Sequence, residues 1–193
     1  MTEVEQHPLQ PFLPQSAKVL MLGSFPPPRV RWSMDFFYPN YQNDMWRVLG
    51  LIFYGDKNRF VIEQDKKFDY KAVVDFCTSA GIAIFDTATA VKRQKGNASD
   101  KFLEIVQPSD LSVLLKQVPN CQAIATTGEK ATDTIIESYN CTKPKIGTFS
   151  KLSINGRGYK FYRMPSTSRA YPMKLEQKAE FYKMMFSELG IGF

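Results

Sequence analysis

The sequence predicts an α/β protein in which a central, mostly parallel sheet lies between two layers of helices. Three short apolar segments, at residues 19–22, 82–85 and 121–128, have the length and composition of buried strands. Each of them precedes a segment whose apolar residues recur at helical spacing. Strands that alternate with helices pair in parallel and bury both faces of the sheet, so this order favours a three-layer α/β/α sandwich.

Three helices are predicted between and after the first two strands. The first begins at residue 43 or 44, where apolar residues start to recur every three or four positions. A second covers residues 70–80, and Gly81 supplies its end. The Ser-Asp pair at 109–110 can cap a third, which carries its leucines on one side.

The last third of the chain adds two helices and a hairpin. Gly128 opens a helix directly after the third apolar strand. Residues 151–164 alternate around an Asn-Gly pair, which predicts a hairpin whose second strand leads into the stretch PSTSRAYP. A final helix covers about 174–189 and buries one apolar side.

Length and charge suggest one domain with a polyanionic partner. At 193 residues the chain is long enough for one sizeable core, and we expect residues 1–16 to form an arm laid over a single domain at 17–193. The formal net charge of +6 is compatible with nucleic acid as a partner, although it also serves plain solubility.

Composition argues against several site classes. The three cysteines lie far apart without a CxxC pair, so we expect no disulfide framework and no zinc or iron–sulfur site. The single histidine, His7, stands beside Pro8 in a start that we expect to be flexible, which predicts no histidine base in the core. The sequence shows no membrane-spanning run, and the acids and prolines of its first residues are unlike a signal peptide, so we expect a cytoplasmic protein.

Four polar segments should meet at one edge of the sheet. They are GSFPPP, FDTATA, TTGEKA and MPSTSRA, and each follows a predicted strand. In parallel sheets ligands bind at the carboxyl ends of the strands. The aromatic stretch FFYPNYQNDMW at 36–46 follows the first segment and fits neither a strand nor a helix period. These segments offer hydroxyls, amides, flat rings and one carboxylate, without a phosphate-loop or GxGxxG motif.

These segments carry a resemblance to a known family. GSFPP at 23–27, the aromatic stretch at 36–46 and MPSTSR at 164–169 together resemble the uracil-DNA glycosylase superfamily, most closely its hypoxanthine-DNA glycosylase branch. The stretch GIAIFDTATAVKRQKGNASD at 81–100 also looks like that branch. The resemblance implies the same three-layer fold, no cofactor or metal, and cleavage of the bond between a damaged base and its deoxyribose in DNA.

The resemblance also implies roles for particular residues. Asn43 and Ser24 would be catalytic, with Asn43 orienting water or contacting the base. The base would be held by Phe25, Phe37, Tyr38 and Asp86. DNA would be contacted by Ser166, Thr167, Ser168, Arg169 and the helix start at Gly128, while Arg169, Tyr171 or Met173 would fill the gap left by the flipped nucleotide.

Structural roles compete with each of these assignments. Asn43 could simply cap the helix that contains Trp46, and Asp86 could cap the turn that follows it. The ring of Phe37 or of Tyr38 could fill space in the core instead of stacking on a base. Trp46 is expected to be core. The basic residues Arg29, Arg31, Lys92, Arg93 and Lys95 could track the DNA backbone, or could be ordinary solvated charges.

The sequence departs from the family pattern in base-facing and DNA-wedge positions. Ser24-Phe25 replaces the aspartate that some branches carry in the first motif, and Met164 replaces the histidine that precedes Pro-Ser in the best-known branch. The segment after PSTS reads Arg-Ala-Tyr instead of Pro-Ala-Asn. These departures concern the substrate and activity more than the fold.

The leading hypothesis is a monofunctional DNA glycosylase that removes a deaminated base, uracil or hypoxanthine, and acts as a monomer. Monofunctional chemistry is expected because no lysine is obvious in the site; Lys130, in a helix start, is the nearest candidate. One alternative is a non-catalytic nucleic-acid-binding module on the same fold, which would bind oligonucleotides and release nothing. A third is a hydrolase of small phosphorylated or nucleoside substrates.

Overall fold

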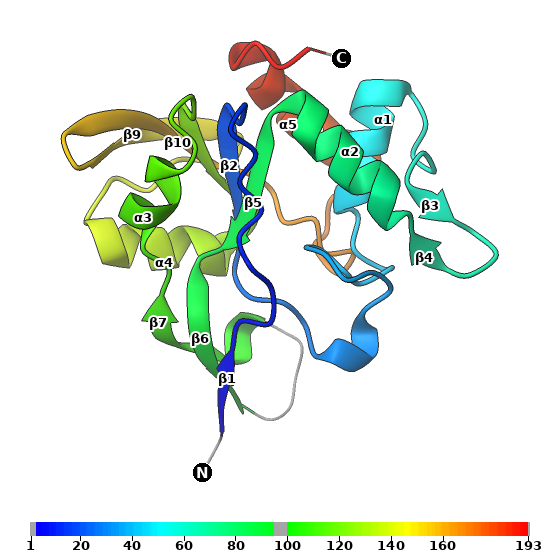
Figure 1. The fold of residues 1–193 in the computed structure, drawn as a ribbon, viewed down its shortest axis with the longest axis horizontal. Helices are drawn as coiled ribbons and strands as arrows, with labels where there is room; N and C mark the ends of the chain where they lie inside the picture. The colour runs from blue at the N-terminus through cyan, green and yellow to red at the C-terminus, as the bar shows by residue number, and fades with distance from the viewer. Residues whose placement is uncertain (1–2, 95–99, 193) are drawn as a thin grey trace.

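The computed structural model describes residues 3–94 and 100–192, and a five-stranded sheet forms its centre (Figure 1). The strand order is β5-β2-β8-β10-β9. The first four strands in that order are parallel to one another, and β9 pairs antiparallel with β10 at one edge. The strands are β2 (Val19–Gly23), β5 (Ile82–Asp86), β8 (Ala123–Thr126), β9 (Thr148–Ile154) and β10 (Arg157–Arg163).

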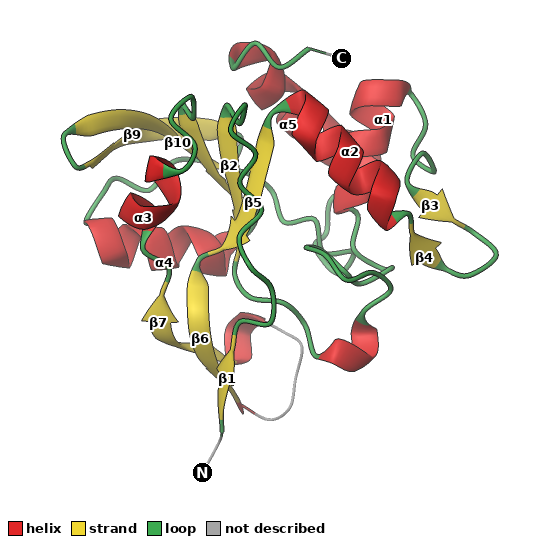
Figure 2. Cartoon of the chain, viewed as in Figure 1, coloured by secondary structure: helices red, strands yellow, loops and turns green. Residues whose placement is uncertain are grey.

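Helices cover both faces of this sheet, so the predicted three-layer fold is confirmed (Figures 1 and 2). One layer contains α1 (Met45–Tyr54), α2 (Tyr70–Ala80) and α5 (Leu175–Glu188). The other contains α3 (Leu111–Lys116) and α4 (Glu129–Tyr139). No helix among the described residues is long and apolar enough to cross a membrane.

Local signals placed the ends of these elements correctly. Asp110 caps α3 by accepting a hydrogen bond from the backbone of Ser112, and Gly81 ends α2 with a φ of +71°. The two-residue turn between β9 and β10 has positive φ at both Asn155 and Gly156, as the Asn-Gly pair predicts.

The sequence interpretation missed two small antiparallel sheets. β1 (Val4–Gln6), β6 (Ala88–Arg93) and β7 (Leu103–Pro108) form one of them, and β3 (Val61–Ile62) pairs with β4 (Lys67–Phe68). Two single 3-10 turns, η1 (Arg29–Arg31) and η3 (Asp100–Phe102), were missed as well. The two- and three-residue elements are too short for a periodic pattern to show, and β7 is mostly exposed, so it lacks the continuous apolar run of the central strands.

The N-terminal arm is fastened to the domain through its backbone. β1 adds to β6 with Val4 opposite Lys92, and Phe12 exchanges both backbone hydrogen bonds with Ile84 of β5, at 3.0 and 2.9 Å. Phe12 and Leu13 are partly buried and pack against the core, which anchors the arm through its side chains as well. The expectation that His7 lies in a flexible start is therefore wrong: it sits between two segments that are hydrogen-bonded to strands.

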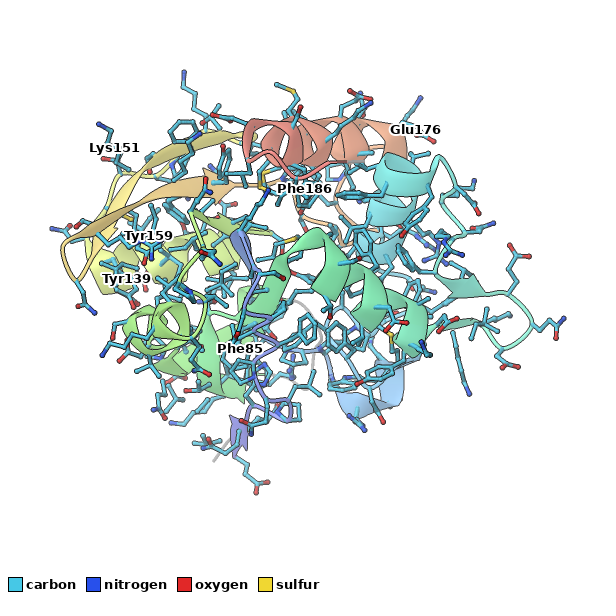
Figure 3. All side chains as sticks on the ribbon, turned by 45° about the horizontal axis from the view of Figure 1, so that its top comes forward. Phe85, Tyr139, Lys151, Tyr159, Glu176 and Phe186 are labelled. Atoms are coloured by element: carbon cyan, nitrogen blue, oxygen red, sulfur yellow. The ribbon has the colours of Figure 1, made fainter. Side chains whose placement is uncertain are left out.

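The core fills the space between the sheet and the helices. Trp46 is fully buried, as predicted. The centroid of its ring lies 6.0 Å from that of Phe36 and 6.4 Å from that of Phe60. Phe186 of α5 points inward and lies 5.3 Å from Phe53, whereas Lys151 and Glu176 point outward (Figure 3).

The topology determines where a crevice opens. The chain leaves β2 toward the layer of α1 and α2, and leaves its neighbour β8 toward α4 in the opposite layer (Figure 1). Adjacent parallel strands whose connections diverge in this way leave a crevice beyond their carboxyl ends, where α/β proteins bind ligands.

Candidate functional site

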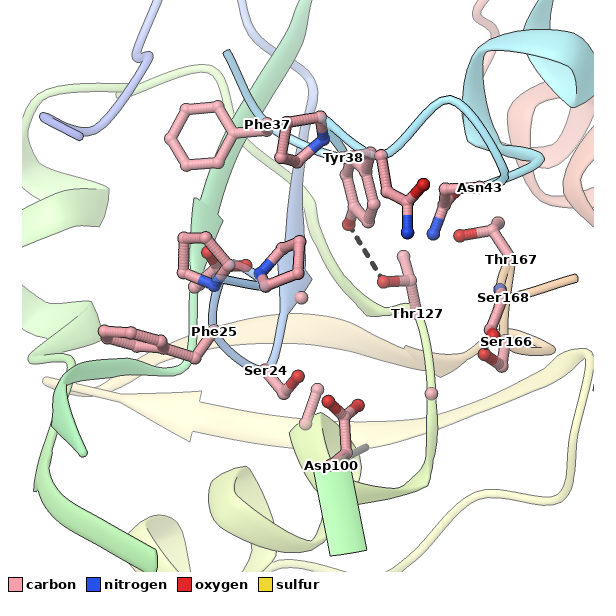
Figure 4. Close-up of a pocket in the computed structure, with 18 of the residues that line it drawn as sticks. Ser24, Phe25, Phe37, Tyr38, Asn43, Asp100, Thr127, Ser166, Thr167 and Ser168 are labelled. Atoms are coloured by element: carbon pink, nitrogen blue, oxygen red, sulfur yellow. Dashed lines mark hydrogen bonds between the residues drawn. The ribbon is translucent and has the colours of Figure 1, made fainter. Parts of the chain in front are cut away.

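A cleft of about 550 Å³ opens at the topological switch point, which is the place beyond the carboxyl ends of β2 and β8 where their connections diverge (Figure 4). Its volume lies in the range of small-molecule and nucleotide sites. All four segments that the sequence predicted to gather contribute to its lining, and so does the aromatic loop. The lining includes Gly23, Ser24, Phe25, Phe37, Tyr38, Asn43, Asp86, Asp100, Thr127, Gly128, Ser166, Thr167 and Ser168.

The aromatic loop is irregular because it serves the core on one side and the cleft on the other. Phe36 and Phe37 are almost fully buried and touch edge to face, with ring centroids 5.2 Å apart. The indole of Trp46 donates a hydrogen bond to the carbonyl of Phe37 at 3.2 Å. The loop is thus a rigid wall, and Phe37 is both a core plug and part of the lining.

Tyr38 is locked in place as a neutral phenol. Its hydroxyl lies 2.9 Å from Oγ1 of Thr127, which itself donates to the carbonyl of Leu22 at 3.3 Å, so the tyrosine is the donor in this pair (Figure 4). Burial, helped by the charge of Asp86, raises the pKa of Tyr38 far above its ordinary value. Its φ of +49° is a left-handed conformation that is strained for a tyrosine.

Asn43 makes a local structural contact and also lines the cleft. Its Oδ1 accepts a hydrogen bond at 2.9 Å from the backbone N–H of Met45, the first residue of α1, and so closes the turn that leads into this helix. That contact occupies the oxygen, so Nδ2 is the atom of this amide that can donate to a ligand in the cleft. The backbone of Asn43 also forms a bridge with Ser168, which ties the aromatic loop to the segment after β10.

The segment 165–168 is held from below by a buried ion pair. Lys178 of α5 has no exposed side-chain surface, and its Nζ donates to Oδ2 of Asp44 and to the carbonyl of Ser168, both at 2.9 Å. The backbone of Asp44 donates to Thr167 at 2.8 Å. This network fixes the hydroxyl-bearing segment against the aromatic loop.

Arg169 lies on the outer side of the same network. Its Nε reaches Oδ1 of Asp44 at 3.3 Å, and its side chain is 51% exposed. It does not line the cleft, whereas Ala170 and Tyr171 do. Of the three predicted gap-filling residues, Tyr171 is therefore the one that the fold brings to the cleft.

Asp86 has an unforeseen partner. Its Oδ2 lies 2.9 Å from Nε2 of His7, and the side chains of the two residues are only 9% and 4% exposed. The side chain of the single histidine is buried after all, because the arm carries His7 across the end of β5. The expectation of no histidine base stays a prediction. The signal that could have pointed to its position is the short distance along the chain from Phe12, because a partly buried Phe12 beside β5 keeps His7 close to the same strand.

Asp100 is a site residue that the sequence interpretation missed. Its carboxylate lies next to the hydroxyl of Ser24 (Figure 4). Burial raises the pKa of Asp100 above its ordinary range, while the nearby Ser24 hydroxyl opposes the shift. Asp100 is exposed as a residue and also lines the cleft. It escaped notice because it follows a polar loop without periodicity.

Only some of the basic residues that could follow the DNA backbone lie where they could reach it. Arg31 lines the cleft, and Arg29 is an exposed partner of Asp35. Arg93 is buried, and it binds Glu5 and the carbonyl of Pro26, so its predicted contact with a DNA backbone is wrong. Lys95 lies outside the described residues. In residues 3–94 and 100–192, no group of three or more His, Cys, Asp or Glu side chains is arranged to hold a metal ion.

Comparison with known proteins shows which fold this chain shares with a solved structure. No family model matches the sequence, and no curated protein matches it. The chain is similar to the solution NMR structure of a protein from Methanosarcina acetivorans that is provisionally described as a uracil DNA glycosylase. The two share 20% identity and a TM-score of 0.66, over 97% of this chain and 99% of the other. At this identity the likeness establishes a shared fold, including the predicted parallel sheet between helix layers.

Proposed function

We propose that this protein is a DNA N-glycosylase that hydrolyses the bond between a deaminated base, uracil or hypoxanthine, and its deoxyribose. The observation that carries the proposal is the cleft at the switch point, where an aromatic wall, an amide donor and a carboxylate acceptor converge on a nucleotide-sized space. The shared fold with a protein described as a uracil DNA glycosylase supports the same function.

Base recognition follows from the groups that face the cleft. Both uracil and hypoxanthine present a carbonyl oxygen beside a ring N–H. Nδ2 of Asn43 would donate to the carbonyl, and the carboxylate of Asp86 would accept from the ring N–H. Phe25, Phe37 and Tyr38 would supply apolar and aromatic contact to the face of a base taken out of its stack.

Catalysis requires charge stabilisation on both sides of the breaking bond. As the bond from C1′ to the base nitrogen breaks, its electron pair goes to the base and positive charge develops on the sugar. The Asn43 amide would stabilise the departing base, as preorganised donors do. A water held by Asp100 and Ser24 would attack C1′ and pass its proton to Asp100, whose raised pKa suits a general base.

DNA phosphates would lie along the rim. Ser166 and Ser168 offer hydroxyls, and Gly128 opens α4, whose first backbone N–H groups suit an anion. Arg31 at the cleft adds positive charge. Arg169 would approach the backbone from the outer side of the Pro165–Ser168 segment.

The test is single-turnover base release from labelled oligonucleotides that carry uracil, hypoxanthine, xanthine or a T·G mismatch, in single and double strands. Asn43→Asp keeps an oxygen to accept from the backbone of Met45 and removes the donor, so it should slow release by about 100-fold while the protein stays folded. Gln42→Ala, an exposed change in the same loop, is the matched control and should behave as the parent.

Two outcomes would redirect the proposal. If DNA binds with strong salt dependence and no base is released, the protein is the non-catalytic module. If Asn43→Asp releases base at the parent rate, the amide donor has no part in the chemistry and the site has been assigned wrongly.

A further inference from the structure

The N-terminal arm delivers the chain's single histidine to the wall behind the cleft. The backbone of His7 donates to Thr89 of β6 at 2.8 Å, and the Phe12–Ile84 pairing holds the arm on its other side. The imidazole packs edge to face on Phe25, with centroids 5.2 Å apart, and lies 4.7 Å from Phe85.

Both ring nitrogens of His7 are engaged. Nδ1 lies 2.9 Å from the carbonyl and 3.1 Å from the amide nitrogen of Leu9, two residues along the arm. Nε2 lies 2.9 Å from Oδ2 of Asp86. The arm backbone therefore sets the orientation of the ring, and the ring in turn holds one oxygen of the carboxylate.

The two oxygens of Asp86 consequently have different surroundings. Oδ2 faces His7, whereas Oδ1 lies so close to Cα of Gly23 that a Cβ at that position would be 2.3 Å from it. Gly23 and Asp86 both line the cleft. The strand end that carries Asp86 is fixed separately, because the hydroxyl of Ser109 donates to the carbonyl of Asp86 at 2.7 Å.

We propose that His7 is a positioning residue that makes Asp86 present a single acceptor oxygen to the cleft, and so selects bases that carry a ring N–H. This inference rests on the proposed glycosylase function. Without the contact from Nε2 of His7 to Oδ2, no side-chain hydrogen bond within the described residues fixes which oxygen of Asp86 faces the cleft. The acceptor then no longer has one set position, so its match to a ring N–H is lost.

A purely structural role would make His7 an anchor for the arm, and variants separate the two readings. His7→Phe keeps a ring among Phe25 and Phe85 and removes the contact to Asp86. His7→Gln can place an amide N–H near the position of Nε2 and is the conservative rescue. Phe12→Leu loosens the arm at its other anchor without touching Asp86, and serves as the matched control.

The first readout is substrate selection. Release of uracil is compared with release of 3-methyluracil, whose ring N–H is replaced, from otherwise identical oligonucleotides. His7→Phe should lower uracil release by about 10- to 100-fold and shrink the preference over the methylated base. His7→Gln should restore most of the rate, and Phe12→Leu should keep the parent preference. An unchanged preference in folded His7→Phe, or an equal loss in Phe12→Leu, overturns the proposal.

The second readout does not need turnover. Because the chain has one histidine, the ring 15N signals of histidine-labelled protein all belong to His7. They should change in Asp86→Asn, and in the parent they should shift on titration with free uracil or hypoxanthine. If the parent releases no base while these shifts occur, the glycosylase proposal fails and the positioning role stands. Signals that are indifferent to both Asp86→Asn and the bases overturn the positioning role itself.

Discussion

Removal of the buried ammonium of Lys178 should destabilise the protein severely. In Lys178→Met the aliphatic stem is replaced at similar volume, but Asp44 and the carbonyl of Ser168 each lose a hydrogen bond of 2.9 Å. Loss of one partner from a buried ion pair costs about 3–5 kcal/mol, because the other charge is left uncompensated. Arg169 stays 3.3 Å from Asp44 but is half exposed, so it offsets little. We expect a loss of about 3 kcal/mol.

Urea unfolding followed by far-ultraviolet circular dichroism measures this loss directly. At unchanged m value, the midpoint should fall, and Tm should drop by about 6–12 °C for a chain of this size. Lys151→Met is the matched control, since Lys151 is exposed on β9, and it should stay within about 0.5 kcal/mol of the parent.

A double variant tests the cause. Asp44→Asn combined with Lys178→Met removes the uncompensated charge, so it should recover at least about 1 kcal/mol of the loss in Lys178→Met. A loss below about 1 kcal/mol in Lys178→Met, or no recovery in the double variant, would refute the view that this ion pair holds the segment after β10.

Three further changes probe other parts of the structure. Gly23→Ala places a Cβ 2.3 Å from Oδ1 of Asp86, so thermal unfolding should show a loss of about 1–3 kcal/mol, and a variant as stable as the parent would contradict that close approach. The Tyr162 hydroxyl, at 2.7 Å, and Lys160 hold the pKa of Glu188 below its ordinary value; this stabilisation is complete above about pH 4.5 and is lost as pH falls through the lowered pKa. The stability gap between the parent and Glu188→Gln should therefore close in acid, and a gap that is constant from pH 7 to pH 3 would exclude this linkage. Arg31→Ala should weaken oligonucleotide binding and reduce the slope of log K against log salt by about 0.9 if Arg31 contacts one phosphate, whereas an unchanged slope removes it from the DNA interface.

The sequence alone determined the layout of the fold and the place of the cleft. The apolar runs that became β2, β5 and β8 are buried on both faces, so their composition signalled strands in the middle of a sheet. Caps such as Asp110 and the Asn-Gly turn are local, since each depends on neighbours within a few residues. Because parallel strands end at one edge of a sheet, the order of the strands alone predicts that four separate segments meet there.

Only the tertiary structure decided which side chains meet within that cleft. His7 and Asp86 are 79 positions apart, and Asp44 and Lys178 are 134 positions apart. Hydrophobic periodicity reports whether a residue faces the core or the solvent, but it carries no information about the partner that a buried charge will find. His7 therefore read as part of a flexible start and Arg93 as a free surface charge, although the packing of the arm pairs each of them with an acidic side chain.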